Sequence, residues 1–411
     1  MTPIAFPRAL RRCAHNKTES GDAMSTLDLT RPDYLEDEEV AMFERSVLGF
    51  IDRFAKAEDI ERWRKDKQVD RRTWQEAANA GLLGISVPPE YGGAGGDFRH
   101  EIVIAKELGH VGADALTISL HNAVIIPYFL SFGTEDQKMR WLPQMCTGEC
   151  ILAIAMTEPG AGSDLQGMKM TARKTEGGYL LNGQKTFISN GQIADVILVA
   201  AKSDPQAGSK GMSLFIVDTR QAGGGFRRGN NLEKVGQEGQ DTSELFFDDV
   251  FVPDDCLLGG EPGQGMRQLM AKLPQERLVI AWQAMAMIEQ AVAETVAYVR
   301  ERKMFGQALI DFQNTQFKLA EIKTMATVAR VFVDHCTRLQ LDGKLDASTA
   351  SMAKYWISDK ASEIIDECLQ LFGGYGYMLE YPIARLYRDS RIHRIYGGAN
   401  EVMKVLIARS L

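Results

Sequence analysis

The first third of the chain places apolar residues at the three- and four-residue spacing of amphipathic helices. This spacing runs through three stretches of residues 37–148, which read EEVAMFERSVLGFIDRFAKAE, RTWQEAANAGLLG and RHEIVIAKELGHVGADALTISLHNAVIIPYFLSFG. Glycine or proline separates the stretches, and both residue types end helices. The pattern predicts an all-α N-terminal domain over residues 36–150.

The pattern changes to short strand-like runs from Ile151 to about Leu258. Within TARKTEGGYLLNGQKTFISNG, the pair Asn182-Gly183 separates two such runs, which is a strong hairpin signal. The later runs ADVILVAAK, GMSLFIVDT and SELFFDDVFVP are separated by turn residues. We expect a small antiparallel β-domain over residues 151–262.

The helical spacing returns at Gly263 and continues to Leu411. Three long stretches and a short last one carry it: QAMAMIEQAVAETVAYVRERKMF, TQFKLAEIKTMATVARVFVDHCTRLQ, ASTASMAKYWISDKASEIIDECLQLFGG and ANEVMKVLIARSL. Four helices with short connections pack naturally as an up-down bundle. The fold class is therefore α+β: a helical domain, a β-domain, and a C-terminal four-helix bundle over residues 263–411.

Composition narrows the range of partners. The 411 residues are 45% hydrophobic and 25% charged, as in an ordinary globular protein. The formal net charge of -8 is spread along the chain, and no basic stripe is interleaved with aromatic residues, so we expect no nucleic acid partner. No apolar run is long enough to cross a bilayer. The chain is also longer than one hydrophobic core usually supports, which agrees with several domains.

The cysteines indicate a reducing compartment and no metal site. They are scattered, and no histidine stands at zinc-ligand spacing from the one close pair, Cys146 and Cys150. We therefore expect free thiols. All six are Cys13, Cys146, Cys150, Cys256, Cys336 and Cys368.

The N-terminus allows two interpretations. Residues 1–18 contain Arg8, Arg11, Arg12 and Lys17 without an acid, as in a mitochondrial transit peptide. They are equally compatible with an upstream extension of the reading frame, since a natural start at Met24 is plausible. We favour the second interpretation and a bacterial cytoplasm, with the mitochondrial matrix as the alternative. Residues 1–35 are expected to form an unstructured or targeting extension.

One carboxylate falls on an apolar helix face. In KLPQERLVIAW, Glu276 shares its face with Leu273, Val279 and Ile280, so its side chain points toward a core. A buried carboxylate must be paired, protonated or used in chemistry, because desolvation disfavours its charged form. A structural ion pair at a helix start and a catalytic role both remain open at this point.

Three glycine-rich stretches, YGGAGGD, AMTEPGAGSD and LFGGYGY, invite a nucleotide-binding interpretation. None follows a strand and opens a helix with G-x-G-x-x-G, and the phosphate-loop pattern is absent. Each stretch alone is typical of a turn. AMTEPGAGSD differs because it lies where helical spacing gives way to strand spacing, and its small residues let backbone amides approach a flat or anionic ligand.

Together with QKTFISNG, ERKMFGQ, CLQLFGGYGY and YGGANEVMKVLIAR, this stretch resembles the acyl-CoA dehydrogenase family of flavoproteins. The motifs occur in the family's order from about residue 38 to the C-terminus. LPQERL, SMAKYW and IYGGANEVMK are most similar to the long-chain branch. The resemblance implies FAD, an acyl-CoA substrate, a homotetramer, and an electron-transferring flavoprotein as acceptor.

The resemblance also implies which residues bind FAD. Thr157 would hydrogen-bond the flavin ring beside Met156, and Phe187 and Ser189 stand where the family usually has tryptophan and threonine. Both substitutions keep an aromatic face and a hydroxyl. The remaining implied contacts are Ser163 in the flavin loop, Arg302, Phe305 and Gln313 on the pyrophosphate and adenine side, Gln370, Gly373 and Gly374 from a neighbouring subunit, and Ala399 and Glu401 in the C-terminal motif.

The chemistry of the family needs a base for the proton α to the thioester carbonyl, a hydride acceptor at flavin N5, and donors for the enolate oxygen. Many members take the base from a glutamate directly after the tyrosine of the C-terminal motif, but this chain has Gly397 after Tyr396. In the long-chain and isovaleryl branches the base lies in an ER pair like Glu276-Arg277. We therefore interpret Glu276 as the catalytic base, in an apolar pocket that raises its pKa.

Four residues are expected at the substrate. The backbone N–H of Gly397 can bind the thioester oxygen, and Arg277 is a positioning residue, because arginine stays charged. Tyr396 and Ser163 complete the set by resemblance. Small residues before His121, namely Gly112, Ala113, Ala115 and Ser119, suggest a deep slot for a long or branched chain, although ordinary helix packing explains them equally well.

Three functions stay open on the sequence. The first is an acyl-CoA dehydrogenase that produces a trans-2-enoyl-CoA. The second is an acyl-CoA oxidase or flavin monooxygenase on the same fold, which differs in how the reduced flavin reacts with oxygen. The third is a non-catalytic acyl-CoA-binding or assembly protein, suggested by the missing glutamate at Gly397 and opposed by the presence of Glu276.

Overall fold

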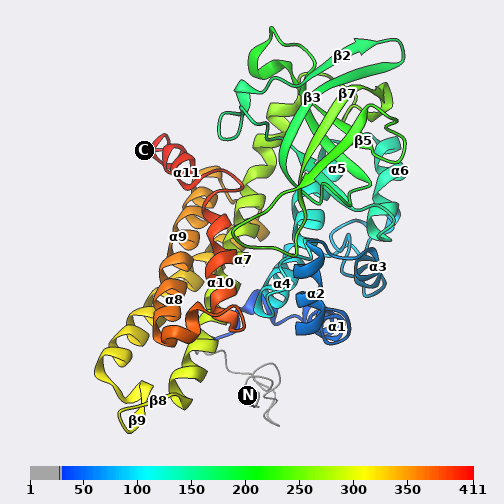
Figure 1. Cartoon of the computed structure of the whole chain (residues 1–411). Helices are drawn as coiled ribbons and strands as arrows, with labels where there is room; N and C mark the ends of the chain where they lie inside the picture. Colours follow the sequence, from blue (N-terminus) through cyan, green and yellow to red (C-terminus); the bar gives the residue numbers. More distant parts are fainter. Residues whose placement is uncertain (1–26, 28–29) are drawn as a thin grey trace.

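A computed structural model describes residue 27 and residues 30–411 (Figure 1). The chain forms N-terminal helices, then a sheet, then a C-terminal bundle, in the predicted order. The basic residues Arg8 to Lys17, Cys13 and Met24, on which the interpretation of the N-terminus rests, lie outside the described residues.

The segment before the first domain is more ordered than expected. Asp33–Leu35 form a 3₁₀ turn, and Leu27 and Leu35 are buried. The Tyr34 hydroxyl donates to Asp334 at 2.6 Å and Arg338 pairs with Asp33, so the segment is held against the C-terminal bundle. The expectation that the chain is unstructured up to residue 35 is therefore wrong for residues 30–35, because long-range contacts supply the order.

Short amphipathic helices build the N-terminal domain. Side-chain caps set where several of them begin: Asp37, Asp70, Asp97 and Thr134 each accept a backbone N–H at a helix start. Trp63 and Trp74 fill the core beneath them. The elements are α1 (Glu38–Phe54), α2 (Ala57–Asp66), α3 (Arg71–Asn79), α4 (Phe98–His110), a π-helix at Leu120–Ile125, α5 (Ile126–Phe132) and α6 (Glu135–Cys146).

A seven-stranded sheet forms the middle domain, with β5 joined to β4 and the remaining order β1-β4-β2-β3-β7-β6. Most pairs are antiparallel, as predicted, but β1 and β2 each pair with β4 in parallel, so the sheet is mixed. The strands are β1 (Leu152–Ala155), β2 (Thr171–Thr175), β3 (Gly178–Ser189), β4 (Val196–Lys202), β5 (Met212–Asp218), β6 (Phe226–Asn231) and β7 (Thr242–Pro253).

The hairpin expected at Asn182-Gly183 is wrong. Both residues lie inside β3, and the turn that joins β2 to β3 falls at Glu176-Gly177. Asn182 exchanges two hydrogen bonds with Asp249 of β7, and the β3–β7 register shifts between Leu181 and Gly183. The glycine, at φ 147, therefore serves a β-bulge rather than a turn.

Three long helices and one short helix form the C-terminal bundle. α7 (Gly265–Glu301) packs against α8 (Gln313–Leu341), α9 (Ala347–Phe372) and α10 (Pro382–Ser390). The fourth helix of the bundle is thus α10, whereas the terminal helix α11 (Asn400–Ala408), expected in that role, packs mainly on α9. A small β8–β9 hairpin (Lys303–Met304 and Gln307–Ala308) links α7 to α8.

Helix α7 connects the two ends of the molecule. Its 37 residues correspond to about 55 Å at 1.5 Å per residue. In Figure 1 it runs from beside the sheet to the far end of the bundle, where the β8–β9 hairpin lies. No helix in the described part of the chain is long and apolar enough to cross a membrane.

Candidate active site

Glu276 lies in the part of α7 near the sheet and is 5% exposed. The buried Tyr128 of α5 donates its hydroxyl to Glu276 Oε1 at 2.7 Å. Burial raises the pKa of Glu276 to about 7, although the Tyr128 hydrogen bond and the charges of Arg277 and Lys272 oppose the rise. A carboxyl group with this pKa can take up a proton near neutral pH.

The sequence also left open that Glu276 forms an ion pair at a helix start, and the described part of the chain shows no such pair. Among the described residues, the charged oxygens of Glu276 have a tyrosine as their hydrogen-bond partner rather than a lysine or arginine. Arg277 points elsewhere: it donates to Ser351 Oγ on α9 at 3.2 Å, and its Nε is buried without a partner. Adjacent in sequence, the two side chains leave α7 in different directions.

The C-terminal motif lies against the same face of α7. Glu276, Ile280 and Gln283 follow at four and seven residues on that helix, and the Tyr396 hydroxyl donates to Gln283 Oε1 at 3.2 Å. Gly397 has φ 63, and a Cβ there would lie 2.2 Å from Ile280 Cδ1. A side chain at position 397 would therefore meet the end of the Ile280 side chain, which would have to move.

On the sheet, the residues expected at the flavin ring lie on neighbouring segments. Thr157, just after β1, accepts a hydrogen bond from the Thr186 backbone N–H of β3 at 2.9 Å, which places Met156 and Thr157 beside Phe187. Phe187 has φ 59 and is 68% exposed, so its ring is free to contact a ligand. Ser189 ends β3 and is half-buried, and Ser163 is exposed in the loop after Thr157.

The other expected FAD residues gather at the opposite end of the bundle. Arg302 follows Glu276 by about seven helical turns, or about 39 Å along α7. Arg302 stacks over the Tyr375 ring at 5.5 Å, which brings the segment after α7 next to the one after α9. Six exposed residues share this end: Arg302, Phe305, Gln313, Gln370, Gly373 and Gly374. Within a single chain, these residues therefore lie far from Phe187.

Ala399 and Glu401 lie with the C-terminal motif rather than with either group. Ala399 is the N-cap of α11, and its carbonyl accepts the backbone N–H groups of Val402 and Met403. Glu401 is exposed in the first turn of the same helix. The structure shows no direct role for Ala399 beyond starting α11.

Three buried residues at the site were missed in the sequence. Tyr128 gave no signal, because an aromatic residue in an apolar stretch is typical of a core. Lys185 and Lys354 are both 0% exposed, but each lies in an element that also carries several other polar residues, so the sequence carried no sign of their burial. Lys185 holds the flavin loop by donating to the Met156 carbonyl at 3.0 Å and to Glu158 at 2.9 Å.

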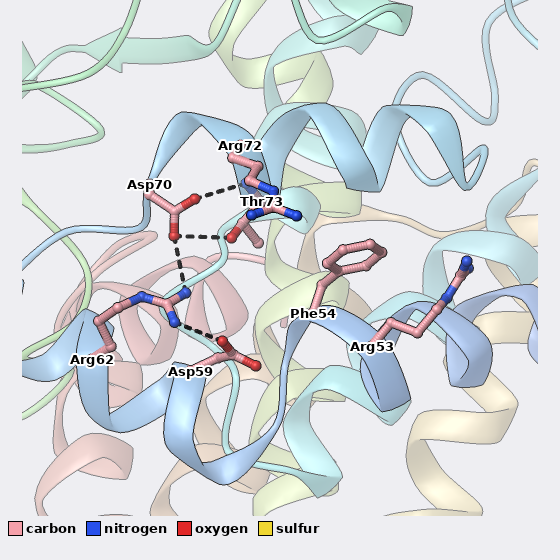
Figure 2. A pocket seen from close by; sticks show the side chains of 7 residues that line it. All are labelled: Arg53, Phe54, Asp59, Arg62, Asp70, Arg72 and Thr73. Carbon is pink, nitrogen blue, oxygen red and sulfur yellow. Dashed lines mark hydrogen bonds and ion pairs between the residues drawn. The ribbon is translucent and has the colours of Figure 1, made fainter.

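A surface pocket of about 350 Å³ lies elsewhere, between the end of α1, α2 and the start of α3 (Figure 2). Arg62 bridges Asp59 and Asp70 across it, and Asp70 also accepts from the Thr73 backbone. None of the residues expected at the cofactor or substrate lines it. Among the described residues, no group of three or more metal-ligating side chains is present, and Cys146, Cys150, Cys256, Cys336 and Cys368 are free thiols.

Family comparisons cover all three parts of the structure. Family models for the acyl-CoA dehydrogenase N-terminal, middle and C-terminal domains match residues 37–149, 153–250 and 263–411. The chain belongs to the acyl-CoA dehydrogenase family. Members of this family are FAD flavoproteins, and the chain is an enzyme of the class that dehydrogenates acyl-CoA thioesters.

Individual acyl-CoA dehydrogenases resemble the chain over nearly its full length. The mouse mitochondrial long-chain specific acyl-CoA dehydrogenase is 42% identical over 98% of this chain and 94% of its own. A crystal structure of an acyl-CoA dehydrogenase from Geobacillus kaustophilus is 46% identical, covers 92% of this chain and 99% of its own, and has a TM-score of 0.89. A glutaryl-CoA dehydrogenase from Mycobacterium smegmatis in complex with FADH2 is 28% identical over 94% and 97%, with a TM-score of 0.85.

The residues of this acyl-CoA dehydrogenase suit FAD. The exposed ring of Phe187 offers a stacking surface, and Thr157 and Ser189 supply hydroxyls next to it. At the far end, the guanidinium of Arg302 forms no ion pair among the described residues and can bind a pyrophosphate. The donor set therefore fits the cofactor, provided that two copies of the chain contribute to each site.

Proposed function

We propose that Glu276 is the catalytic base that removes the α-proton of a bound acyl-CoA. The observation that carries this proposal is the carboxyl group itself, buried in α7, bonded to Tyr128, and raised in pKa to about 7 by burial. A base whose pKa lies near the working pH is partly ionised at that pH and still binds the proton strongly enough to remove it. The product would be a trans-2-enoyl-CoA.

The second part of the proposal concerns the thioester carbonyl. Gly397 lies against Ile280 on the Glu276 face of α7, and as a glycine it lets the loop backbone approach the helix this closely. We infer that its backbone N–H donates to the thioester oxygen and stabilises the negative charge that develops when the proton leaves. Tyr396 and Arg277 would hold the loop and helix around this oxygen. FAD, when bound, supplies the acceptor for the β-hydride.

The third part concerns assembly. Since Phe187 lies in the sheet on β3 and Arg302 follows the end of α7 that points away from the sheet (Figure 1), we propose that each FAD lies between two copies. Met156, Thr157, Ser163, Phe187 and Ser189 would contact its flavin side, and the far-end group of Arg302, Phe305, Gln313, Gln370, Gly373 and Gly374 would contact the rest from a second copy. A homotetramer, as the resemblance implies, would satisfy every site.

Chain length is proposed from the relative rather than from the small residues before His121. α4 ends at His110, so Gly112, Ala113 and Ala115 lie in a connection, whereas Ser119 lies at the start of the following helical segment. A Cβ at Gly239 would lie 3.0 Å from Ala115 Cβ, so Ala115 packs closely against the segment between β6 and β7, as ordinary packing requires. The mouse relative is named as long-chain specific. We propose a long or branched acyl chain for this enzyme on that ground.

We propose an electron-transferring flavoprotein as acceptor, with an oxidase as the alternative on the same fold. The two differ in one measurement: an oxidase's reduced flavin is reoxidised rapidly by oxygen. For the compartment we propose the bacterial cytoplasm, as the Geobacillus relative suggests, with the mitochondrial matrix as the alternative suggested by the mouse relative.

The experiment that tests the proposal mixes purified holoenzyme anaerobically with acyl-CoA thioesters of increasing chain length. We expect the flavin absorbance to bleach, fastest with long or branched chains. Bleaching that is fastest with butyryl-CoA would contradict the chain-length proposal alone. Absence of bleaching with every chain would contradict the dehydrogenation itself.

A further inference from the structure

Beneath the C-terminal motif lies a buried lysine that forms no ion pair with any carboxylate among the described residues. Lys354 of α9 is 0% exposed, and its Nζ donates to the Gly398 carbonyl at 2.7 Å and to Asn400 Oδ1 at 2.9 Å. Both acceptors are neutral. Burying an ammonium group without a counter-ion is costly, so a purely structural role would be better served by an apolar side chain.

The two hydrogen bonds of Lys354 fix the position of the loop at Gly397 and Gly398, which would otherwise be flexible. Gly397 and Gly398 have φ 63 and 94, and a glycine pair has wide conformational freedom. Asn400 extends the anchor, because its Nδ2 donates to Ser358 Oγ at 3.0 Å and Asp359 Oδ1 at 2.9 Å, both on α9. The loop between Tyr396 and α11 is therefore tied to α9 from below while Gly397 packs on α7.

A second cation reaches the same part of α9. Arg277 donates to Ser351, which lies one turn before Lys354, and the two charges repel, since Arg277 contributes to the lowered pKa of Lys354. Burial is the larger cause of that pKa, which is about 8, while Asp359 and Glu401 oppose it. His393 adds no charge, because burial lowers its pKa to about 3. Two cations, Lys354 and Arg277, therefore reach the part of α9 beneath the loop, and Asp359 and Glu401 are the acidic groups that oppose them.

We propose that Lys354 is a positioning residue for α-proton removal: it fixes the Gly398 carbonyl so that the Gly397 N–H stays aimed at the thioester oxygen, and its charge favours the enolate. In this step the proton passes from the α-carbon to a Glu276 oxygen, and the electron pair of the broken C–H bond moves toward the carbonyl oxygen. No oxidant enters the step. This inference rests on the proposed function of Glu276 and Gly397.

The test separates proton removal from hydride transfer. A 3-thia-acyl-CoA has sulfur in place of the β-carbon, so it can lose an α-proton but has no β-hydride to give. Holoenzyme is incubated with it in D₂O, and α-deuteration is followed by mass spectrometry for the wild type, Lys354→Met and Lys404→Met. Lys404 is the matched control, since it is an exposed lysine on α11. Its Nζ lies 5.3 Å from the centroid of the Tyr355 ring.

We expect exchange about 100-fold slower in Lys354→Met, the size of effect seen when an oxyanion donor is lost or misplaced. The dissociation constant of the 3-thia analogue and the FAD content should change less than about threefold, because ground-state binding is not the function assigned to Lys354. Lys404→Met should exchange like the wild type. Lys354→Gln keeps a hydrogen-bond donor without the charge, so its exchange rate should lie between those of Lys354→Met and the wild type. If Lys354→Met does not fold, Lys354→Gln takes its place in the test.

Two results would overturn the inference: wild-type exchange in both Lys354 variants, or slower exchange that is fully accounted for by weaker analogue or FAD binding. A wild-type enzyme that itself catalyses no exchange would instead contradict the proposed function. The two failures are therefore distinguishable in one experiment.

Discussion

Gly397 lies directly against Ile280, one helical turn beyond Glu276: a Cβ on the glycine would be 2.2 Å from Ile280 Cδ1. A side chain at position 397, where the resemblance places the base of many family members, would therefore have to displace the Ile280 side chain on the helix that carries the proposed base, Glu276. Position 397 thus lies against the face of α7 that carries the proposed base.

Exchange of Glu276 for glutamine should abolish proton removal while leaving the fold and cofactor in place. An amide cannot accept the α-proton, and loss of a general base costs about 10²–10⁴-fold. We expect anaerobic flavin reduction by acyl-CoA to slow by at least that range, with FAD content unchanged. Glu294→Gln, on the same helix, is the control and should reduce its flavin normally. Rapid reduction in Glu276→Gln would place the base elsewhere.

The rate of flavin reduction should follow the ionisation of Glu276. Burial raises its pKa to about 7, so the rate at saturating substrate should increase with pH and level off above about pH 7. The Tyr128 hydrogen bond favours the charged form, so Tyr128→Phe should move the profile to higher pH. Tyr91→Phe removes a hydroxyl bonded to Glu135 at the same 2.7 Å on the surface, and it should leave the profile unchanged.

The same ionisation should appear in stability. The pKa of Glu276 is higher in the folded state than the 4.5 of a free glutamate, so its contribution is fully present at low pH and is lost as pH rises through about 7. Relative to the wild type, Glu276→Gln should therefore gain about 2–3 kcal/mol in unfolding free energy between pH 5 and pH 8. Urea unfolding of both proteins at the two pH values measures this difference. A difference that does not change with pH would show that the carboxyl group is not desolvated.

Gly397→Ala should destabilise the enzyme by about 1–3 kcal/mol, because it adds a clash and a side chain at positive φ. Ile280→Ala removes the side chain that the new Cβ would meet. The double variant should therefore lose less stability than the sum of the two single variants, with a coupling of about 0.5–3 kcal/mol. Strict additivity in the thermodynamic cycle would mean that the two positions do not touch.

Mixed assemblies test the shared cofactor site. Glu276→Gln and Arg302→Ala chains should each be nearly inactive, the first through its base and the second through weaker FAD binding. If each site takes Glu276 from one chain and Arg302 from another, co-refolding the two variants should create some sites with both residues intact and restore activity. Activity that stays at the level of the separate variants would place both residues in one chain's site.

The sequence pattern predicted the elements where local signals and packing agree. The face of Glu276 was correctly predicted as buried, because helical spacing alone orders Leu273, Val279 and Ile280 around it. Asn182-Gly183 was misread because its bulge depends on Asp249 in a strand that is distant in sequence. Tyr128 could not be assigned to Glu276 for the same reason. The domain boundaries at residues 150 and 262 and the roles of the cofactor-contacting residues stay predictions.

Helix α7 holds Glu276 near one end and leads into Arg302 at the other. In the proposed assembly, α7 therefore contributes to two active sites at once. It supplies the base Glu276 to one site and positions Arg302 to bind the cofactor of another. The enzyme's retention of FAD would then report on quaternary structure: dilution that separates the chains should strip the flavin before any helix unfolds.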